Sequence, residues 1–439
     1  MTVVPLTRRT ATAARPENPE KKKFVAALDI GSSKVCCMIA EVVPDKRPLP
    51  GEPAHPRLKI RGVGHQASRG VKAGTIVNID EAERAIRVAV DQAERMAKVS
   101  VAQVFVNVSG GRPQCTTYSD TVSTDGEVVS HRHLNEVMAR AYSQCDPGNR
   151  AILHATPVGF SLDEASGIGE PEGMFGETLG CDLNVITVDR GALRNLALAI
   201  ERCHLSVEGF VLAPYAAARG ALVEDELELG ATLIDMGGAT TSFAVFQDSR
   251  LAHADVVPVG GAHITSDLAK GLSTNIVHAE RLKTLSGSAL AATSDEREVV
   301  AVPLLGELGL DTVQKIPRSM LTGIIRPRLE ETFELVRDRL VDLGLKGKGG
   351  RIVLTGGASQ LNGAREVASQ IFDRSVRVAT PRGLSGLPEI LSTPPFAVVA
   401  GLLRYALNPD RQLERLVATT RRGESNYFSR VGQWIKESF

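Results

Sequence analysis

The sequence predicts an α/β protein made of two related halves, and three observations lead to this expectation. Its 439 residues are 43% hydrophobic, which is enough to bury a sizeable core. A unit of strand, acidic residue, glycine turn and strand recurs about 206 residues later, with Asp235 in the place of Asp29. Candidate helices alternate with candidate strands between the two copies. This is an internal repeat of a supersecondary unit and not a short solenoid period.

Charge and cysteine content exclude several classes of protein. Lys and Arg number 51, and so do Asp and Glu, so no domain-wide basic field exists and no nucleic-acid partner is expected. The six cysteines form no C-x-x-C pair, which favours free thiols in a reducing cytoplasm. No apolar run reaches the roughly 18 residues of a transmembrane helix.

The first half is expected to begin at Phe24, after a disordered basic arm at 1–23 that has no apolar core of a signal peptide. F-V-A-A-L-D-I, G-S-S and K-V-C-C-M-I-A-E-V predict two buried strands joined by a tight turn. A helix is expected at about 80–98, with Asp80 as its N-cap. The Ser-, Thr- and Gly-rich segment 100–177 predicts a small α+β insert.

The second half is expected from about residue 210. A-P-Y-A-A-A-R-G-A-L predicts a helix of small residues, and A-T-L-I-D-M-G-G-A-T-T-S-F-A-V-F repeats the first strand–turn–strand unit. A third glycine turn lies between a strand and a helix at 351–363. Beyond Asn408 a polar linker, 409–424, leads to a terminal segment, 425–439.

The glycine turns carry the chemistry of the chain. Glycines let an anion approach backbone N–H groups, and the hydroxyls of Ser32 and Ser33 add donors. Asp29 and Asp235 are candidates to hold Mg²⁺ through water, and the turn at 356–358 lets a nucleoside lie on the backbone. Any one turn is typical of an ordinary hairpin. Three turns in this order predict a clamp for a nucleoside polyphosphate.

These motifs resemble those of the actin, Hsp70 and sugar-kinase superfamily. L-D-I-G-S-S-K-V is similar to its first phosphate motif, L-I-D-M-G-G-A-T-T-S to its second, and I-V-L-T-G-G-A-S-Q-L-N-G to its adenosine motif. A-P-Y-A-A-A-R-G-A-L and A-V-V-A-G-L-L-R-Y-A resemble the two connecting helices that cross at its hinge. The resemblance implies an actin-like ATPase fold, with two duplicated RNase H-like halves around a nucleotide cleft.

Within that superfamily the chain resembles the bacterial cell-division family FtsA. The similar segments are R-G-V-K-A-G-T-I-V-N-I-D, V-N-V-S-G, V-G-G-A-H-I-T-S-D-L-A, A-E-R-L-K and I-x-R-P-R-L-E-E, and the resemblance covers about 24–408 plus the tail. It implies ATP and Mg²⁺ as ligands. It also implies four partners: the C-terminal tail of the tubulin-like FtsZ, other copies of the chain in a protofilament, later division proteins through the insert, and anionic lipid. The location implied is the cytoplasmic face of the inner membrane, at the division site.

The resemblance also implies a division into subdomains. These are 1A at 24–99 and 178–209, 1C at 100–177, 2A at 210–244 and 315–408, and 2B at 245–314. Subdomain 1C is the α+β insert, and the amphipathic C-terminal helix follows the linker.

Site residues follow from the matched motifs. Those implied to bind the nucleotide are Gly31, Ser32, Ser33, Lys34, Gly237, Gly238, Ala239, Thr240, Gly356, Gly357 and Ala358. Glu280 and Lys283 lie three apart on one helix face and are implied to reach the nucleoside, although the pattern alone is typical of a solvated face. Arg328 and Glu331 are implied to bind the FtsZ tail, although the pattern alone fits a charged helix start.

Three departures from the superfamily pattern bear on hydrolysis. Ala239 and Ser242 replace a glycine and an acidic residue of the second phosphate motif, and Ala213 replaces a glutamate that helps to position the attacking water. We therefore assign no firm catalytic residue, with Asp29 and Asp235 left as candidates to position metal or water. ATP binding with weak or no hydrolysis is expected.

The tail holds the only tryptophan of the chain, Trp434. At helical spacing an apolar stripe forms, flanked by two basic residues; together these are Tyr427, Phe428, Arg430, Val431, Trp434, Ile435, Lys436 and Phe439. The tail alone fits either a helix that docks on its own domain or one that binds anionic lipid. The resemblance favours lipid.

Three rival functions share the fold. A sugar kinase needs a catalytic aspartate beside a polar pocket, and a chaperone needs a peptide-binding domain after the adenosine motif; neither is recognisable here. An adaptor of the pilus-assembly actin-like type is the nearest alternative, and it would lack the amphipathic tail.

Overall fold

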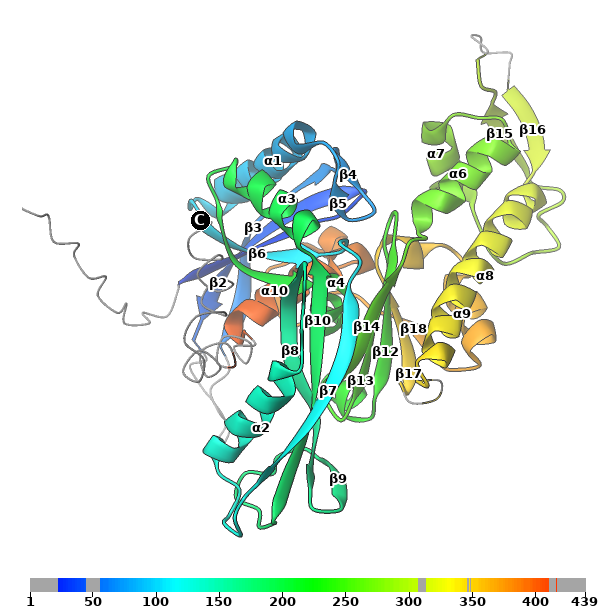
Figure 1. The fold of residues 1–439 in the computed structure, drawn as a ribbon. Helices are drawn as coiled ribbons and strands as arrows, with labels where there is room; N and C mark the ends of the chain where they lie inside the picture. Colours follow the sequence, from blue (N-terminus) through cyan, green and yellow to red (C-terminus); the bar gives the residue numbers. More distant parts are fainter. Residues whose placement is uncertain are drawn as a thin grey trace, which may run out of the picture.

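The computed structural model describes residues 23–44, 56–306, 313–345, 347, 349–409 and 416. Two sheets with their helices lie side by side, and two smaller parts project from them (Figure 1). The predicted basic arm, apart from Lys23, and the predicted amphipathic tail at 425–439 lie outside the described residues. No described helix combines the length and apolar character needed to cross a membrane.

The first sheet has the order β11-β6-β1-β2-β3-β19. Its strands are β1 (Phe24–Ile30), β2 (Lys34–Val43), β3 (Arg57–Ala67), β6 (Gln103–Val108), β11 (Ser206–Leu212) and the short β19 (Leu384–Ser385). β1, β2 and β3 pair antiparallel in chain order, whereas β6 runs parallel to β1 and β11 parallel to β6. The central strands are buried on both faces, which explains their continuous apolar sequence.

The second sheet repeats this topology. Its order is β14-β13-β12-β17-β18, formed by β12 (Ala231–Met236), β13 (Thr241–Gln247), β14 (Arg250–Val257), β17 (Arg351–Thr355) and β18 (Val376–Val378). β12, β13 and β14 pair antiparallel, and β17 and β18 follow in parallel. The predicted duplication is therefore confirmed at the level of strand order and direction.

Helices occupy corresponding places in the two halves. α1 (Ile79–Ala97) and α3 (Arg190–Glu201) pack on the first sheet, whereas α9 (Ala364–Phe372) packs on the second, with α8 (Ser319–Asp342) beside it. α4 (Ala213–Ala221) contacts β12 and β13 of the second sheet, and α10 (Ala397–Leu407) contacts β1 and β6 of the first. The expected N-cap of the first helix was wrong. Asn78 has the extended backbone of an N-cap, and its Oδ1 accepts the N–H of Glu81 at 3.2 Å, so Asp80 lies within the first turn.

The two small-residue helices, α4 and α10, pack against each other at the hinge as predicted. A Cβ on Gly401 would lie 1.6 Å from the carbonyl oxygen of Ala216, and one on Gly220 would lie 2.2 Å from that of Ala397. Only hydrogen fits at these two points. Small residues therefore set how closely the halves approach.

The insert is an α+β unit with its own core. Its sheet, β7-β10-β8-β9, consists of β7 (Gln114–Ser123), β8 (Arg150–Leu162), β9 (Ala165–Ile168) and β10 (Thr178–Asp189), with α2 (His131–Ser143) packed on it. Both boundaries expected for the insert, 100 and 177, are wrong. β6, at 103–108, belongs to the first sheet, so the insert begins after it. β10 pairs with both β7 and β8, with Asp182 opposite Ser119, so the insert sheet extends to Asp189.

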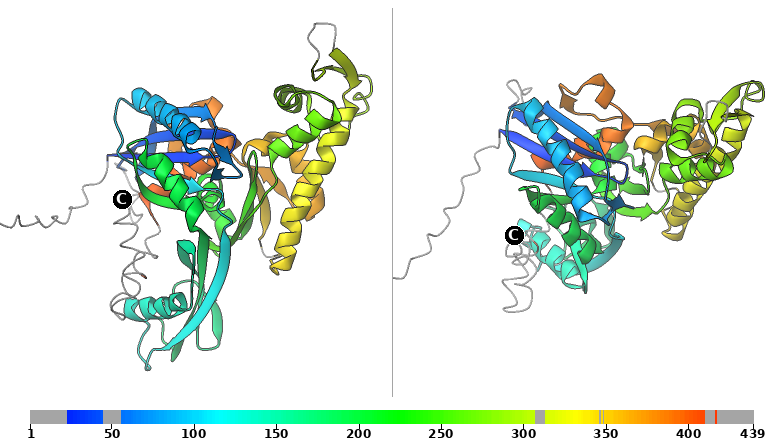
Figure 2. Two further views of the ribbon diagram at one scale, coloured as in Figure 1. Left: turned by 45° about the horizontal axis from the view of Figure 1, so that its top comes forward. Right: turned by 90° about the horizontal axis from the view of Figure 1, so that it is seen from above.

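The outer part of the second half lies between β14 and α8. It contains α6 (Gly261–Gly271), α7 (Ile276–Ser286) and the hairpin of β15 (Val299–Pro303) and β16 (Val313–Pro317). α6 and α7 pack on each other and on α8. In both views of Figure 2 this part lies well apart from the insert.

One described residue of the predicted linker is buried. Leu416 is 2% exposed and belongs to the core of the insert, together with Val137 and Phe160. At this residue the segment 409–424 contacts the folded body, although its polar sequence predicts a linker.

Candidate functional site

The first glycine turn is fixed by hydrogen bonds on both sides. The N–H of Gly31 donates to the carbonyl of Lys34 at 2.9 Å, which closes the turn between β1 and β2. The Oγ of Ser32 accepts the N–H of Gly74 at 3.0 Å, and Asn107 Oδ1 accepts the N–H of Ile30 at 2.7 Å. The hydroxyl hydrogen of Ser32 is then free to donate to an anion. Asn107, buried in V-N-V-S-G, supports the turn from a distant strand and was not singled out in the sequence.

The second turn has the same closing bond. The N–H of Gly237 donates to the carbonyl of Thr240 at 2.9 Å. Ala239 does not adopt a positive φ, so its methyl group replaces the superfamily glycine without backbone strain. The backbone of the second turn therefore reproduces that of the first, although the side chains differ.

The two turns face each other across the halves. A Cβ on Gly238 would lie 3.0 Å from the Cβ of Ser33 and 3.1 Å from its Oγ. The structure therefore brings the two predicted phosphate turns into contact. A larger residue at 238 would push them apart.

Two carboxylates and one lysine lie behind these turns. Asp29 is buried, and its Oδ2 is 3.1 Å from Nζ of Lys34, which also lies 4.7 Å from the centre of the Phe396 ring. Burial and, to a smaller extent, the negative charge of Asp29 together raise the pKa of Asp235 to about 7, against the opposing effect of Lys34. Burial alone would lower the pKa of Lys34, but Asp29, Cys36 and Asp235 together raise it. The predicted carboxylates are thus close enough to repel each other, which suits a cation held between them through water.

The third turn lies beside the second. Gly356 has a φ of +84°, and a Cβ there would lie 2.3 Å from Oδ1 of Asp235, so a side chain is excluded. At Gly357 the nearest atom to a Cβ would be Pro395 Cγ at 4.0 Å, which leaves the space above the backbone open. The backbone of the third turn is therefore accessible on this side.

Glu280 and Lys283 also reach this region. Nζ of Lys283 donates to the carbonyl of Gly261 at 3.0 Å, to Oγ1 of Thr265 at 2.9 Å and to Oε2 of Glu280 at 2.7 Å. A Cβ on Gly261 would lie 3.1 Å from the Cβ of Ala358. The pair therefore lies beside the third turn and does not form an isolated solvated face.

The N-terminus of α6 also contacts the second turn, which no sequence motif had predicted. The N–H groups of Gly261 and Ala262 donate to the carbonyls of Gly237 and Gly238 at 3.0 and 2.7 Å. These bonds hold the second turn against the start of α6 and satisfy N–H groups that a helix N-terminus leaves without an intrahelical partner. The signal was present as two consecutive glycines before an apolar helix, in V-G-G-A-H-I-T-S-D-L-A.

Arg328 and Glu331 lie on α8, and Arg328 contacts Asp267 of α6. Nε of Arg328 is 2.5 Å from Oδ2 of Asp267, and the same guanidinium also pairs with Glu331. The hydrogen bond to Asp267 is the main cause that raises the pKa of Arg328. The structure therefore binds this arginine to other side chains of the outer part, and not to the nucleotide turns.

The chain was also compared with known proteins. The family described as "Cell division protein FtsA" matches residues 232–401, and the domain described as "SHS2 domain inserted in FTSA" matches residues 110–187. The chain is 47% identical over 431 residues to cell division protein FtsA of Rhizobium meliloti (strain 1021), covering 97% of each chain. It is 30% identical over 430 residues to that of Escherichia coli (strain K12), covering 95% of this chain and 99% of the relative.

Solved structures share the fold at low identity. A "PilM-PilN type IV pilus biogenesis complex" matches with a TM-score of 0.61 at 15% identity over 88% of this chain and 99% of that one. MreB5 of Spiroplasma citri bound to ADP matches with a TM-score of 0.52 at 16% identity, over 90% and 99%. These likenesses show the actin-like fold alone, so they do not favour the pilus-assembly alternative. The near full-length matches decide the family: the chain belongs to the FtsA family of bacterial cell-division proteins.

Proposed function

We propose that this protein binds ATP with Mg²⁺ in the cleft between its halves and ties the FtsZ ring to the cytoplasmic membrane through its amphipathic tail. The proposal of nucleotide binding rests on the contact between the two glycine turns at Gly238 and Ser33. The proposal of membrane attachment rests on family membership and on the sequence of the tail.

In the proposed complex, the backbone and hydroxyls of the two turns bind the phosphates. Lys34, held by Asp29 and the Phe396 ring, adds positive charge at the first turn. The adenosine lies on Gly356 and Gly357, and Lys283 with Glu280 bounds it on the other side. Mg²⁺ would neutralise phosphate charge, held through water by Asp29 and Asp235. The MreB5 neighbour, which was solved bound to ADP, supports a nucleotide in this fold.

Hydrolysis is proposed to be slow. The position before Pro214, at the start of α4, is Ala213, which is buried and has no carboxylate to activate water. Loss of a general base costs about 10²- to 10⁴-fold in rate. The nucleotide then controls conformation and self-association more than it supplies energy. A steady-state ATPase assay tests this, and robust turnover that is lost in Asp235→Ala would contradict it.

The proposed site for the FtsZ tail is the outer part of the second half, around Arg328 and Glu331. Arg328 is only part-buried, and α7 beside α8 exposes the apolar Ile276 and Val277. We expect Arg328→Glu to abolish co-pelleting with FtsZ, whereas Arg337→Glu, on the same helix, retains it. Equal pelleting of the two variants would remove this assignment.

Membrane attachment is proposed to depend on many weak tails. A single short amphipathic helix binds lipid reversibly, so self-association of the actin-like body into protofilaments would raise the avidity. Flotation with anionic liposomes, with and without residues 425–439, tests this. The full chain should float and the truncated chain should not. Failure of the full chain to float would contradict the tether.

The insert is proposed to recruit later division proteins. Its own sheet and core make it a separate surface on the opposite side from the outer part of the second half. Deletion of residues 110–189 should retain FtsZ pelleting and lose recruitment. Loss of FtsZ pelleting would show that the insert serves the body itself.

A further inference from the structure

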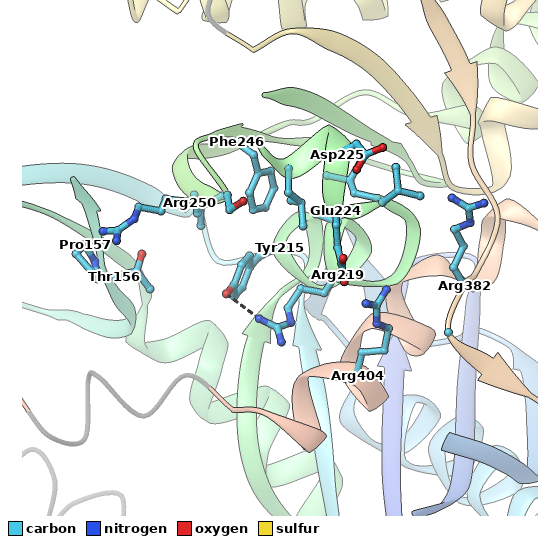
Figure 3. A pocket seen from close by; sticks show the side chains of 17 residues that line it. Thr156, Pro157, Tyr215, Arg219, Glu224, Asp225, Phe246, Arg250, Arg382 and Arg404 are labelled. Atoms are coloured by element: carbon cyan, nitrogen blue, oxygen red, sulfur yellow. Dashed lines mark hydrogen bonds between the residues drawn. The ribbon is translucent and has the colours of Figure 1, made fainter. Parts of the chain in front are cut away.

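A cavity lies between the hinge helices, the insert and the start of β14, and Figure 3 shows the side chains that line it. α10 begins at Ala397, next to the Phe396 ring under Lys34, and reaches the cavity two turns later at Arg404. The volume is about 790 Å³, within the range of small-molecule sites. We call it the hinge cavity. Four arginines, Arg219, Arg250, Arg382 and Arg404, and two carboxylates, Glu224 and Asp225, are among the residues that line it.

Three arginines gather at one end of the hinge cavity. Arg219 and Arg404 lie next to each other, and Arg382 lies beyond Arg404 (Figure 3). Within the described part of the chain, none of the three has a carboxylate within 4.0 Å. Burial lowers the pKa of Arg404, and the positive charges of Arg219 and Arg382 lower it further, against the opposing charge of Glu224. The three arginines at this end of the cavity are therefore positive charges that form no direct salt bridge with a described carboxylate.

Arg219 is held in place with donor capacity to spare. Its guanidinium lies 6.0 Å from the centre of the Tyr215 ring and 5.7 Å from that of Tyr405. Its hydrogen bonds, to Tyr215 Oη and to the carbonyl of Asn408, are both long at 3.5 Å. A guanidinium has five N–H donors, so most of its capacity remains for a ligand.

The other end of the cavity has two buried polar atoms without a hydrogen-bond partner. Among the described residues five side-chain atoms are in this state, and two of them, Thr156 Oγ1 and Arg250 Nη1, line this cavity. Thr156 is 8% exposed. Arg250 is oriented by a bond to the carbonyl of Gly169 and by the Phe160 ring, 5.4 Å away. Both atoms can donate to an anion, which would satisfy them.

We propose that the hinge cavity binds a small organic polyanion, with at least two phosphate or carboxylate groups, between the Arg219–Arg404 pair and the Arg250–Thr156 pair. Guanidinium groups bind both kinds of anion in bidentate geometry. Leu222 and Leu251 in the lining provide apolar contact for the body of the ligand. Arg250 starts β14 of the second sheet and Thr156 belongs to the insert, so the ligand joins the two halves across the hinge.

Titration calorimetry on the full chain tests the site with two probes, fructose 1,6-bisphosphate and citrate. We expect at least one to bind, and the tighter one identifies phosphate or carboxylate as the preferred group. The double variant Arg219→Gln/Arg404→Gln should weaken that binding at least about tenfold. The control Arg337→Gln/Arg365→Gln removes the same charge elsewhere and should bind as the wild type does. Absence of binding to both probes, or equal binding by the double variant, would overturn the proposal.

Thr156→Val separates binding from folding. Because it removes a hydroxyl that has no partner, the melting temperature should stay the same or rise, while probe affinity falls about threefold. A lower melting temperature with unchanged affinity would contradict the role of Thr156.

Two further outcomes would also overturn the proposal. Loss of probe binding in Gly238→Val but not in the double variant would place the anion at the nucleotide turns. An octaglutamate peptide that binds more tightly than either small probe, and that fails to bind the double variant, would show that the ligand is an acidic peptide and not a small anion.

Discussion

The two glycine turns share a backbone and differ in their side chains. In each, the first glycine N–H bonds to the carbonyl three residues on, from Gly31 to Lys34 and from Gly237 to Thr240. The first turn presents two serines and a lysine, whereas the second presents glycine, alanine and threonine. The duplicated topology thus preserves the geometry, and each half contributes differently to the cleft.

The difference has a physical cause. Lys34 lies between Asp29 and the Phe396 ring, so the first half provides charge at the cleft. The second turn is instead held by the N-terminus of α6, so the second half provides oriented backbone dipoles. Substitutions can test this division of roles, beginning with the hinge that both halves share.

The largest effect is expected at the hinge. Gly401→Val would place carbon atoms within 1.6 Å of the carbonyl of Ala216, so α4 and α10 must separate. We expect the free energy of unfolding to fall by about 3 kcal/mol, measured by urea denaturation. Gly323→Val, in the exposed face of α8 with no atom nearby, is the control. Equal midpoints for the two variants would show that the halves do not depend on this contact.

Acid should weaken the junction of the insert with the first half. His154 on β8 is buried, its Nε2 accepts the N–H of Leu212 at 3.0 Å, and burial lowers its pKa to about 4. The unfolded chain therefore binds the proton between about pH 6.5 and 4 while the folded chain does not, so stability falls as the pH falls through this range. The loss is about 3 kcal/mol at most. Melting curves of His154→Gln, which keeps an acceptor, should show a smaller acid dependence; unchanged dependence would assign it to other groups.

The two turns should respond unequally to loss of a side chain. Lys34→Ala removes charge and should weaken ATP affinity about tenfold, whereas Thr240→Ala keeps the backbone and should weaken it about twofold. Fluorescence titration with an ATP analogue measures both variants. Equal losses would mean that side chains contribute alike in the two halves.

The smallest effect is expected for Ala239→Gly. Because the backbone there does not require glycine, restoring the superfamily residue should change ATP affinity less than about twofold. A gain of tenfold in the same titration would show that the methyl group obstructs the phosphates.

Features that depend on short-range pattern were predictable from the sequence. An acidic residue two positions before a glycine, between apolar strands, predicted both turns, and the Ala- and Gly-rich segments predicted the hinge. The positions of the third turn and of the Glu280–Lys283 pair followed from resemblance to known motifs.

Features that depend on distant pairing were not predictable. β10 joins the insert because it pairs with β7, some 60 residues earlier, as between Asp182 and Ser119. Asn107 supports the first turn from 77 residues away. Leu416 enters the insert core from a polar segment, and the hinge cavity gathers Arg219 and Arg404 from two helices. A local sequence pattern does not show which residues distant in the chain will come into contact.

The contact between the two turns is most directly tested by titrating Mg-ATP into wild type, Gly238→Val and Gly159→Val by calorimetry. Gly159, in β8 of the insert with no atom near its Cβ position, is the matched control. We expect wild type and Gly159→Val to bind alike and Gly238→Val to bind about 100-fold more weakly, because its side chain displaces Ser33. Equal affinity in all three proteins would show that the turns do not form a nucleotide clamp.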